Sequence, residues 1–183
     1  MAILYNIKKV VLTELDPNTG VAPTSNGVVA KIDTAASASL EPVISEGDEE
    51  ILRNDSKILA VVRTDDLIYG YDVKLTDNSF EADVAALVGG YKVTEGEGGK
   101  YVTPMMNEGA VAKPFKLDIY VANYSGDAIV NYAKITLNKC IGKFPTMTVG
   151  DGFFAPEFEI KARENTKAKL PIKSIEFVDQ LPQ

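Results

Sequence analysis

The sequence predicts a mainly β fold, an α+β chain in which strands dominate, with one short flanking helix and long loops. Apolar and polar residues alternate along most of the chain, as in the opening run of Ile3, Tyr5 and Ile7. Clusters of Asp, Asn, Pro, Ser and Gly separate the alternating runs, which is typical of turns. Helical spacing of apolar residues is clear in a single segment, about 78–88. Because 183 residues can bury one sizeable core, we expect a single domain over residues 1–183.

The first third of the chain is predicted to form strands separated by polar segments. After the opening strand, the turn-rich segment Asp16–Gly27 leads into an extended run over residues 28–44. The segment Ser45–Lys57 holds five acidic and two basic residues, and we expect a solvated loop or an intersubunit loop there. Two strand-like runs follow, with Thr64–Asp66 as the turn or bulge between them.

The segment Tyr69–Gly90 changes its period in the middle. Its first half alternates as a strand does, and its second half places apolar residues at the spacing of one helix face. We expect the strand and the helix to close one small core, with the helix face packed on a sheet. The residues of this motif are Tyr69, Tyr71, Val73, Leu75, Phe80, Val84, Leu87 and Val88.

The ends of this helix are predicted by its flanking residues. Asn78 is the expected N-cap, with Glu81 three residues later as its capping-box partner, and Asp77 is an alternative N-cap. Gly89 lies where the left-handed residue that ends a helix is expected.

The second half of the chain contains the clearest hairpin. The preceding segment, Tyr91–Gly109, is rich in glycine and too polar for a central strand, so we expect a loop. Residues Phe115–Val121 then alternate, Ser125–Asp127 supply a turn, and residues 128–137 return as a second strand. Further strands are expected over residues 153–178.

The composition excludes several kinds of catalytic site. The chain has no histidine, which removes Ser-His-Asp and Cys-His catalysis and imidazole zinc sites within one chain. The one cysteine, Cys140, cannot form an internal disulfide and is expected to be a small buried apolar residue. The net charge of −7 opposes binding to a nucleic-acid backbone. Because no apolar run could span a bilayer and the start of the chain lacks a secretory signal, we expect a cytoplasmic origin and no membrane partner.

The clusters that suggest a site fail on their spacing. The Gly-rich segment lacks the GK[ST] sequence of a phosphate-binding loop, and the acids of Ser45–Lys57 lack the spacing of a calcium loop. Asp65, Asp66 and Asp72 could supply paired catalytic carboxylates, but adjacent residues of a strand point to opposite faces. We therefore expect no catalytic, cofactor-binding or metal-binding residues, and no enzyme.

The segment Tyr69–Gly90 resembles part of the major tail proteins of long-tailed bacteriophages, which are the tail tube subunits. In that family a strand of the form YdVtLtdn.f leads into a helix of the form evlaLvgG. Here Tyr71–Asn78 match the strand, while Phe80, Val84 and Ala86–Gly90 match the helix. Looser matches outside it are Leu52–Asp55, Leu59–Arg63 and Lys143–Met147.

The resemblance implies a β-sandwich or barrel-like tail tube fold without an additional C-terminal immunoglobulin-like domain. Such subunits form hexameric rings that stack head to tail into a hollow tube, and phage DNA passes through it without specific binding. The implied partners are further copies of the chain, a tape measure protein, and tail terminator and baseplate proteins, in a virion tail assembled in the cytoplasm of the bacterial host. The implied intersubunit loop contains Glu46, Asp48, Glu49, Glu50, Arg53, Asp55 and Lys57.

Other interpretations stay open. An inner tube subunit of a contractile tail, a tailocin or a related injection system would share these features, although the form of residues 69–90 favours a non-contractile tail. A β-sandwich binding or adhesion module is a further alternative. It would need an exposed aromatic platform, and the absence of Trp counts against one.

Overall fold

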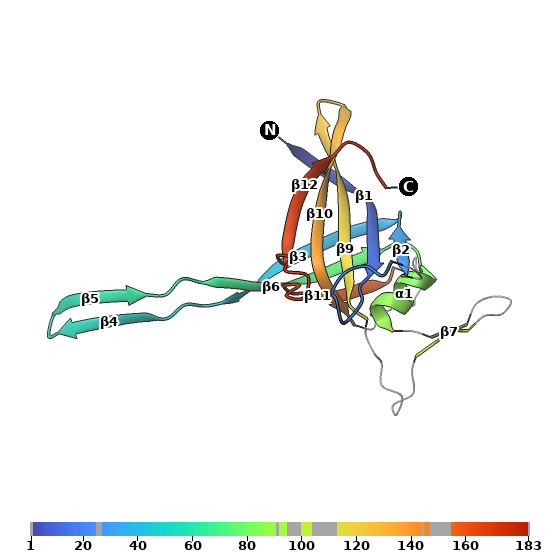
Figure 1. The fold of residues 1–183 in the computed structure, drawn as a ribbon. Helices are drawn as coiled ribbons and strands as arrows, with labels where there is room; N and C mark the ends of the chain where they lie inside the picture. The colour runs from blue at the N-terminus through green and yellow to red at the C-terminus, as the bar shows by residue number, and fades with distance from the viewer. Residues whose placement is uncertain are drawn as a thin grey trace.

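A computed structural model describes residues 2–24, 27–90, 92–94, 100–103, 113–143, 145–146 and 155–182. Strands dominate this part of the chain and all the strand pairs are antiparallel, which confirms the predicted mainly β class (Figure 1). The described residues contain one helix, α1 (Ala82–Gly89). None of the helical segments described is long and apolar enough to cross a bilayer.

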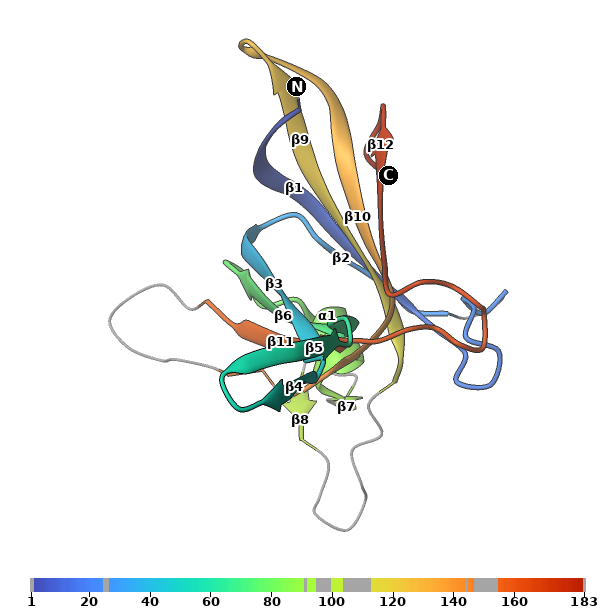
Figure 2. The ribbon, with the colours of Figure 1, turned by 90° about the vertical axis from the view of Figure 1, so that its left-hand side faces the viewer.

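The main sheet has eight strands in the order β2-β1-β9-β10-β11-β6-β3, with β12 paired to β10 beside this path. Strand β10 is long enough to have two neighbours on one side. Its middle part, Tyr132–Leu137, pairs with β12, and its last three residues pair with β11 after an irregularity between Leu137 and Cys140. Because the partner changes there, the strands β3, β6 and β11 run across the lower ends of β1, β9 and β10 (Figure 2). The strands are β1 (Ile3–Glu14), β2 (Val29–Ile32), β3 (Ala35–Ser45), β6 (Leu67–Asp77), β9 (Phe115–Ser125), β10 (Ala128–Gly142), β11 (Glu157–Ala162) and β12 (Lys173–Val178).

The predicted hairpin near residue 126 is confirmed. Strands β9 and β10 pair from Ser125 and Ala128 downwards, and Gly126 takes the positive φ of 62° that the turn requires. The polar segment after α1 contains a short pair of strands, β7 (Lys92–Thr94) and β8 (Lys100–Val102). Other parts of the predicted loop, residues 95–99 and 104–112, lie outside the described residues.

The hydrophobic core joins β6 and α1 to the rest of the sheet. Tyr71 packs against this core while partly buried, and Phe80 is half-buried. Tyr69 is 51% exposed, because β6 extends beyond the core at its beginning. The buried residues of the strand–helix motif are Val73, Leu75, Val84, Leu87 and Val88.

The predicted N-cap of the helix is wrong. The N-cap is Glu81, which has an extended backbone and makes no capping hydrogen bond with its side chain. Asn78 is held elsewhere, since its N–H donates to the Thr34 carbonyl at 3.2 Å. Asp77 cannot cap either, because its Oδ1 accepts the Thr34 hydroxyl at 2.6 Å. Hydrogen bonds to a distant segment therefore override the local capping pattern.

The predicted end of the helix is wrong by one residue. Gly89 is the last helical residue, and Gly90 is the left-handed residue, with φ 68° and its N–H donating to the Ala86 carbonyl at 3.1 Å. The helix ends against β10, where a side chain at Gly142 would collide with Val88. This close approach positions α1 on the sheet.

The predicted polar loop at Ser45–Lys57 is also wrong, because most of it is strand. β4 (Glu49–Asn54) and β5 (Lys57–Arg63) pair as a separate two-stranded sheet. They continue the ribbon formed by β3 and β6 and extend it far from the rest of the molecule (Figure 1). The many polar residues of Ser45–Lys57 made this segment resemble a loop. The strand β4 is built around its two apolar residues, Ile51 and Leu52.

Candidate assembly surfaces

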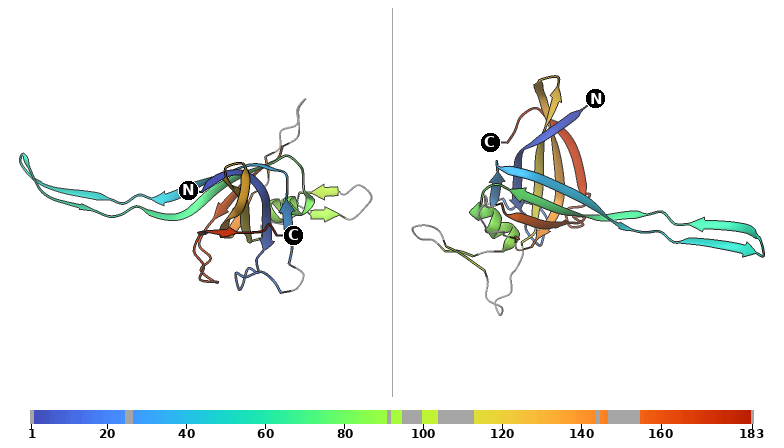
Figure 3. Two further views of the ribbon diagram at one scale, coloured as in Figure 1. Left: turned by 90° about the horizontal axis from the view of Figure 1, so that it is seen from above. Right: turned by 180° about the vertical axis from the view of Figure 1, so that it is seen from behind.

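The most prominent surface is the hairpin arm, defined as residues 49–63. Every residue of β4 and β5 is exposed, and two further views show the arm projecting away from the body of the protein (Figure 3). At roughly 3.3 Å per residue, the distance along the chain from Ser45 to Asn54 is roughly 30 Å. The arm therefore has the reach to contact a neighbouring molecule.

The hairpin arm has apolar side chains on both of its faces. Ile51 lies opposite Val61 on one face, where they are 38% and 53% exposed. Leu52 and Val62 lie on the other face and are 60% and 63% exposed. A sheet usually covers at least one face with a core, and an isolated two-stranded hairpin is only marginally stable in water. Among the described residues, no element covers either face of the arm.

The base of the arm is a defined junction. The Gly47 N–H donates to Asp66 Oδ1 at 2.9 Å, and the Asp48 N–H donates to the Thr64 hydroxyl at 2.8 Å. The Thr64 N–H in turn donates to the Asp48 carbonyl at 3.0 Å. A side chain at Gly47 would collide with the Thr64 carbonyl. These contacts connect the arm to the β3–β6 ribbon and fix how it leaves the body.

The structure brings the predicted intersubunit residues together on the arm and its base. All seven are exposed, and in the part of the chain that the structure describes none forms an ion pair. Asp55 occupies the tip with a φ of 51°, which Asp tolerates better than most residues. Glu46 and Asp48 lie at the base, Glu49, Glu50 and Arg53 on β4, and Lys57 at the start of β5.

Exposed apolar side chains also occur on the main sheet. They include Tyr5 of β1, Val130 of β10 and Phe177 of β12, which are 70%, 58% and 52% exposed. Among the described strands, β2, β3 and β12 each have one neighbour, so each leaves a row of backbone groups open to another chain.

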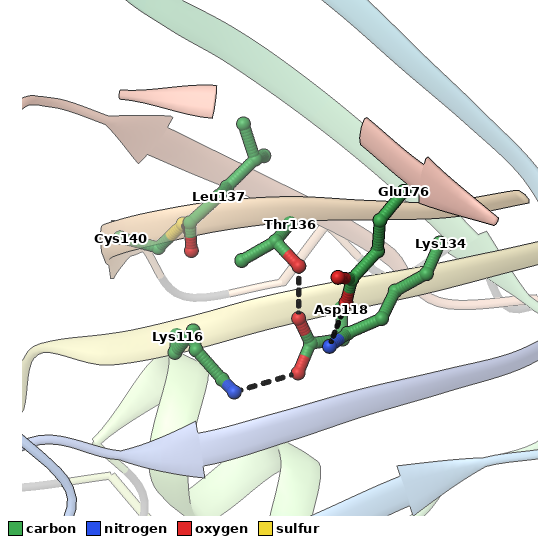
Figure 4. A network of polar contacts seen from close by, with 7 residues as sticks. All are labelled: Lys116, Asp118, Lys134, Thr136, Leu137, Cys140 and Glu176. Carbon is green, nitrogen blue, oxygen red and sulfur yellow. Dashed lines mark hydrogen bonds and ion pairs between the residues drawn. The ribbon is translucent and has the colours of Figure 1, made fainter. Parts of the chain in front are cut away.

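A polar network crosses β9, β10 and β12 (Figure 4). Asp118 is 4% exposed and accepts the Thr136 hydroxyl at 2.5 Å and the Lys116 ammonium at 2.9 Å. Lys134 and Glu176 form an ion pair at 2.7 Å. Burial acts to lower the pKa of Lys134, but its hydrogen bond to Glu176 and the nearby charge of Asp118 together raise it overall, and the same bond lowers the pKa of the Glu176 carboxyl. Each group is satisfied by a neighbour, which is typical of a structural network rather than a catalytic one.

Cys140 is fully buried on β10. Burial raises the pKa of its thiol, so the thiolate is strongly disfavoured. The side chain contributes to the hydrophobic core.

The carboxylates considered as a catalytic pair have separate roles. Asp66 accepts the Gly47 N–H at the arm base. Asp72 belongs to β6, which lies between β3 and β11 in the sheet. Its carboxylate is 3.8 Å from the Arg163 guanidinium. Within the described ranges no group of three or more His, Cys, Asp or Glu residues could hold a metal ion.

Two surface cavities lie beside the end of β10. The larger, of about 270 Å³, is lined by Lys139, Ile141, Gly142, Lys143, Lys161 and Arg163. The smaller, of about 210 Å³, has both acidic and basic residues, including Glu41, Asp72, Glu159 and Lys74. The larger cavity thus combines several cations with little acidic lining.

The chain matches no protein-family model and no curated protein. A proposal for its function therefore rests on the geometry of the hairpin arm, the strand edges and the cavities.

Sequence reasoning missed two features of these surfaces. The junction formed by Gly47 and Thr64 was not predicted, because its hydrogen bonds join segments separated by the whole arm. The basic cavity was missed too, although alternation of Lys139, Ile141 and Lys143 signals one exposed face of a strand.

Proposed function

We propose that the chain is a structural subunit that assembles with copies of itself, specifically a tail tube subunit of a long-tailed bacteriophage or prophage. The hairpin arm carries this proposal, because it presents apolar residues on two opposite faces without a core of its own. The resemblance of residues 69–90 to the major tail proteins supports the more specific role.

The arm offers substantial free energy to an assembly. Full burial of an aliphatic side chain contributes about 1.5–3 kcal/mol, and the arm exposes Ile51, Leu52, Ile58, Leu59, Val61 and Val62 by 38–63%. Covering both faces would then contribute roughly 5–10 kcal/mol before the entropic cost of association is subtracted. A monomer gains none of this, so the arm favours an assembled state.

The arm also favours a directional assembly. An arm that binds a different surface on the next copy makes a heterologous contact, which closes into a ring or continues as a filament. The open edges of β2, β3 and β12 provide a second kind of contact, through which sheets of adjacent copies could pair. Stacked rings require both kinds of contact, one within a ring and one between rings.

The remaining parts of the proposed role follow from the resemblance and the charge. Hexameric rings stack into a hollow tube in the virion tail, assembled in the bacterial host, with tape measure, terminator and baseplate proteins as further partners. A net charge of −7 repels duplex phosphates, so DNA would pass through the lumen without specific binding.

Electron microscopy and sedimentation of the purified protein test the proposal. The wild type is expected to form rings or tubes at high concentration, and the variant Leu52→Asp/Val62→Asp to stay monomeric with an unchanged circular dichroism spectrum. Leu170→Asp is the matched control, since Leu170 is 41% exposed but lies far from the arm in the sequence. A wild type that stays a 19.8 kDa monomer at high concentration contradicts the proposal.

A further inference from the structure

The larger surface cavity carries an unbalanced positive charge. It opens beside the end of β10 and the strand β11, and has a volume of about 270 Å³. Lys143 pairs with Glu159 at 2.9 Å, while Arg163 donates to the Ala162 carbonyl at 2.8 Å and lies 3.8 Å from Asp72.

Two further cations of this cavity have no such partner. Across the described residues, neither Lys139 nor Lys161 forms an ion pair or a side-chain hydrogen bond. Asp72 faces Lys161 across the β6–β11 ladder and lies 3.8 Å from Arg163, and the charge of Lys161 also helps to lower the pKa of Glu159. A net positive charge therefore remains at the β10 side of the cavity.

The cavity is apolar as well as basic. Ile141 is 44% exposed on its wall, and the lysine side chains contribute their methylene groups to the same surface. A ligand that fits must supply carboxylates or phosphates together with an adjacent apolar group.

The start of the hairpin arm has this combination of groups. Glu49 and Glu50 are exposed and have no ion pair in the described part of the chain, and Ile51 and Leu52 follow them directly on the same strand. The arm projects away from the body of its own chain, so a second copy can present these residues to the cavity (Figure 3). A nucleic-acid backbone offers negative charge but no aliphatic surface for Ile141.

We infer that the basic cavity of one copy receives the acidic start of β4 from a second copy. Glu49 pairs with Lys139 and Lys161, and Ile51, which lies on the same face of β4 as Glu49, covers Ile141. The inference rests on the proposed self-assembly and names the surface to which the arm binds. Because arm and cavity are different parts of the chain, the contact has a direction.

A charge-swap experiment tests this pairing. The cavity variant Lys139→Glu/Lys161→Glu and the arm variant Glu49→Lys/Glu50→Lys are each expected to raise the concentration needed for assembly at least tenfold. An equimolar mixture of the two variants, and the chain that carries all four substitutions, should both assemble near the wild-type concentration. The control Lys8→Glu/Lys169→Glu changes the net charge as the cavity variant does, at positions outside the cavity, and should assemble as the wild type does.

The outcomes separate this inference from the proposed function. Assembly of the wild type with no effect of the cavity variant, or with no rescue in the mixture, overturns the inference and leaves self-assembly intact. Failure of the wild type to assemble overturns the proposed function and the inference with it. Loss of duplex DNA binding in the cavity variant, measured by fluorescence anisotropy with assembly unchanged, would assign the cavity to phosphates instead.

A cross-linking experiment on the wild type avoids any effect of substitution on folding. A carbodiimide joins carboxylates to amines in direct contact, and peptide mapping should find Glu49 or Glu50 joined to Lys139 or Lys161. These bonds should form between copies and only at concentrations where the protein assembles. Assembled protein that yields cross-links from the arm to other lysines, and none to these two, overturns the pairing.

Discussion

Two hairpins of this protein, β9–β10 and the hairpin arm, have opposite surroundings. In the hairpin β9–β10, Leu117 and Leu137 face each other and are fully buried in the core. In the hairpin arm, Ile51 and Val61 face each other in the same way and are 38% and 53% exposed. The local sequence specifies a strand in both cases, and what differs is whether the chain supplies a layer to cover it. In the described part of the chain no layer covers the arm, and the proposal is that another copy does.

The largest predicted effect is on the free energy of unfolding, when a leucine in each hairpin is replaced by alanine. Leu117→Ala removes a fully buried side chain and is expected to lower the free energy of unfolding by about 2–5 kcal/mol. Leu52→Ala should change it by less than about 0.5 kcal/mol, since the side chain is exposed in the monomer. Urea denaturation at a concentration below assembly measures both. Equal losses would show that the arm is packed in the monomer.

Charge reversal on the arm should affect assembly and spare the fold. Glu49→Lys/Glu50→Lys places like charges against a basic receiving surface, and we expect the rate of tube growth to fall on the order of tenfold. The melting temperature of the monomer should stay within about 2 °C of the wild type, because both residues are exposed and form no ion pair with any described residue. Light scattering measures the rate of tube growth. Normal tubes from this variant would remove the acidic start of the arm from the interface.

The junction at the base of the arm provides a smaller and more selective effect. Gly47→Ala forces the strand away from the Thr64 carbonyl, so the arm should leave the body at a different angle. We expect weaker assembly with a core that melts as in the wild type. Ser45→Ala is the matched control at the base of the arm, because this substitution adds no atom. If both variants assembled equally well, the junction would have no role in aiming the arm.

The smallest expected effect is a loss of stability in acid. The hydrogen bond from Lys113 lowers the pKa of Glu14 from its ordinary 4.5, and the bond from Lys134 lowers that of Glu176. A carboxyl with a lowered pKa in the folded state stabilises the protein above its ordinary pKa, and this contribution disappears as the pH falls through the folded-state value. Unfolding between pH 6 and pH 3 should show a loss of at most about 1 kcal/mol from Glu14, absent in Glu14→Gln.

The sequence predicts the parts of the fold that depend on local pattern. The β9–β10 hairpin follows from the alternation of apolar and polar residues and from a Ser-Gly-Asp turn. The burial of Val73 and Leu75 agrees with strand spacing, and the burial of Val84 agrees with helix spacing. Features held by distant segments were missed: Thr34 holds Asn78 and Asp77 and so moves the start of the helix. Half of the arm was predicted, since the strand-like run before Thr64 is β5, whereas β4 was assigned to a loop because polar residues flank its two apolar ones. The basic cavity depends on which strands lie next to β10, and the sequence does not contain strand order.

A cryo-electron microscopy reconstruction of the assembled protein tests the role of the hairpin arm most directly. The predicted result is stacked rings around a hollow lumen, with residues 49–63 of each copy buried against its neighbours and Glu49 beside the cations of the next copy. An assembly in which the arm projects into solvent, or a protein that forms no ordered assembly at all, would contradict the proposal.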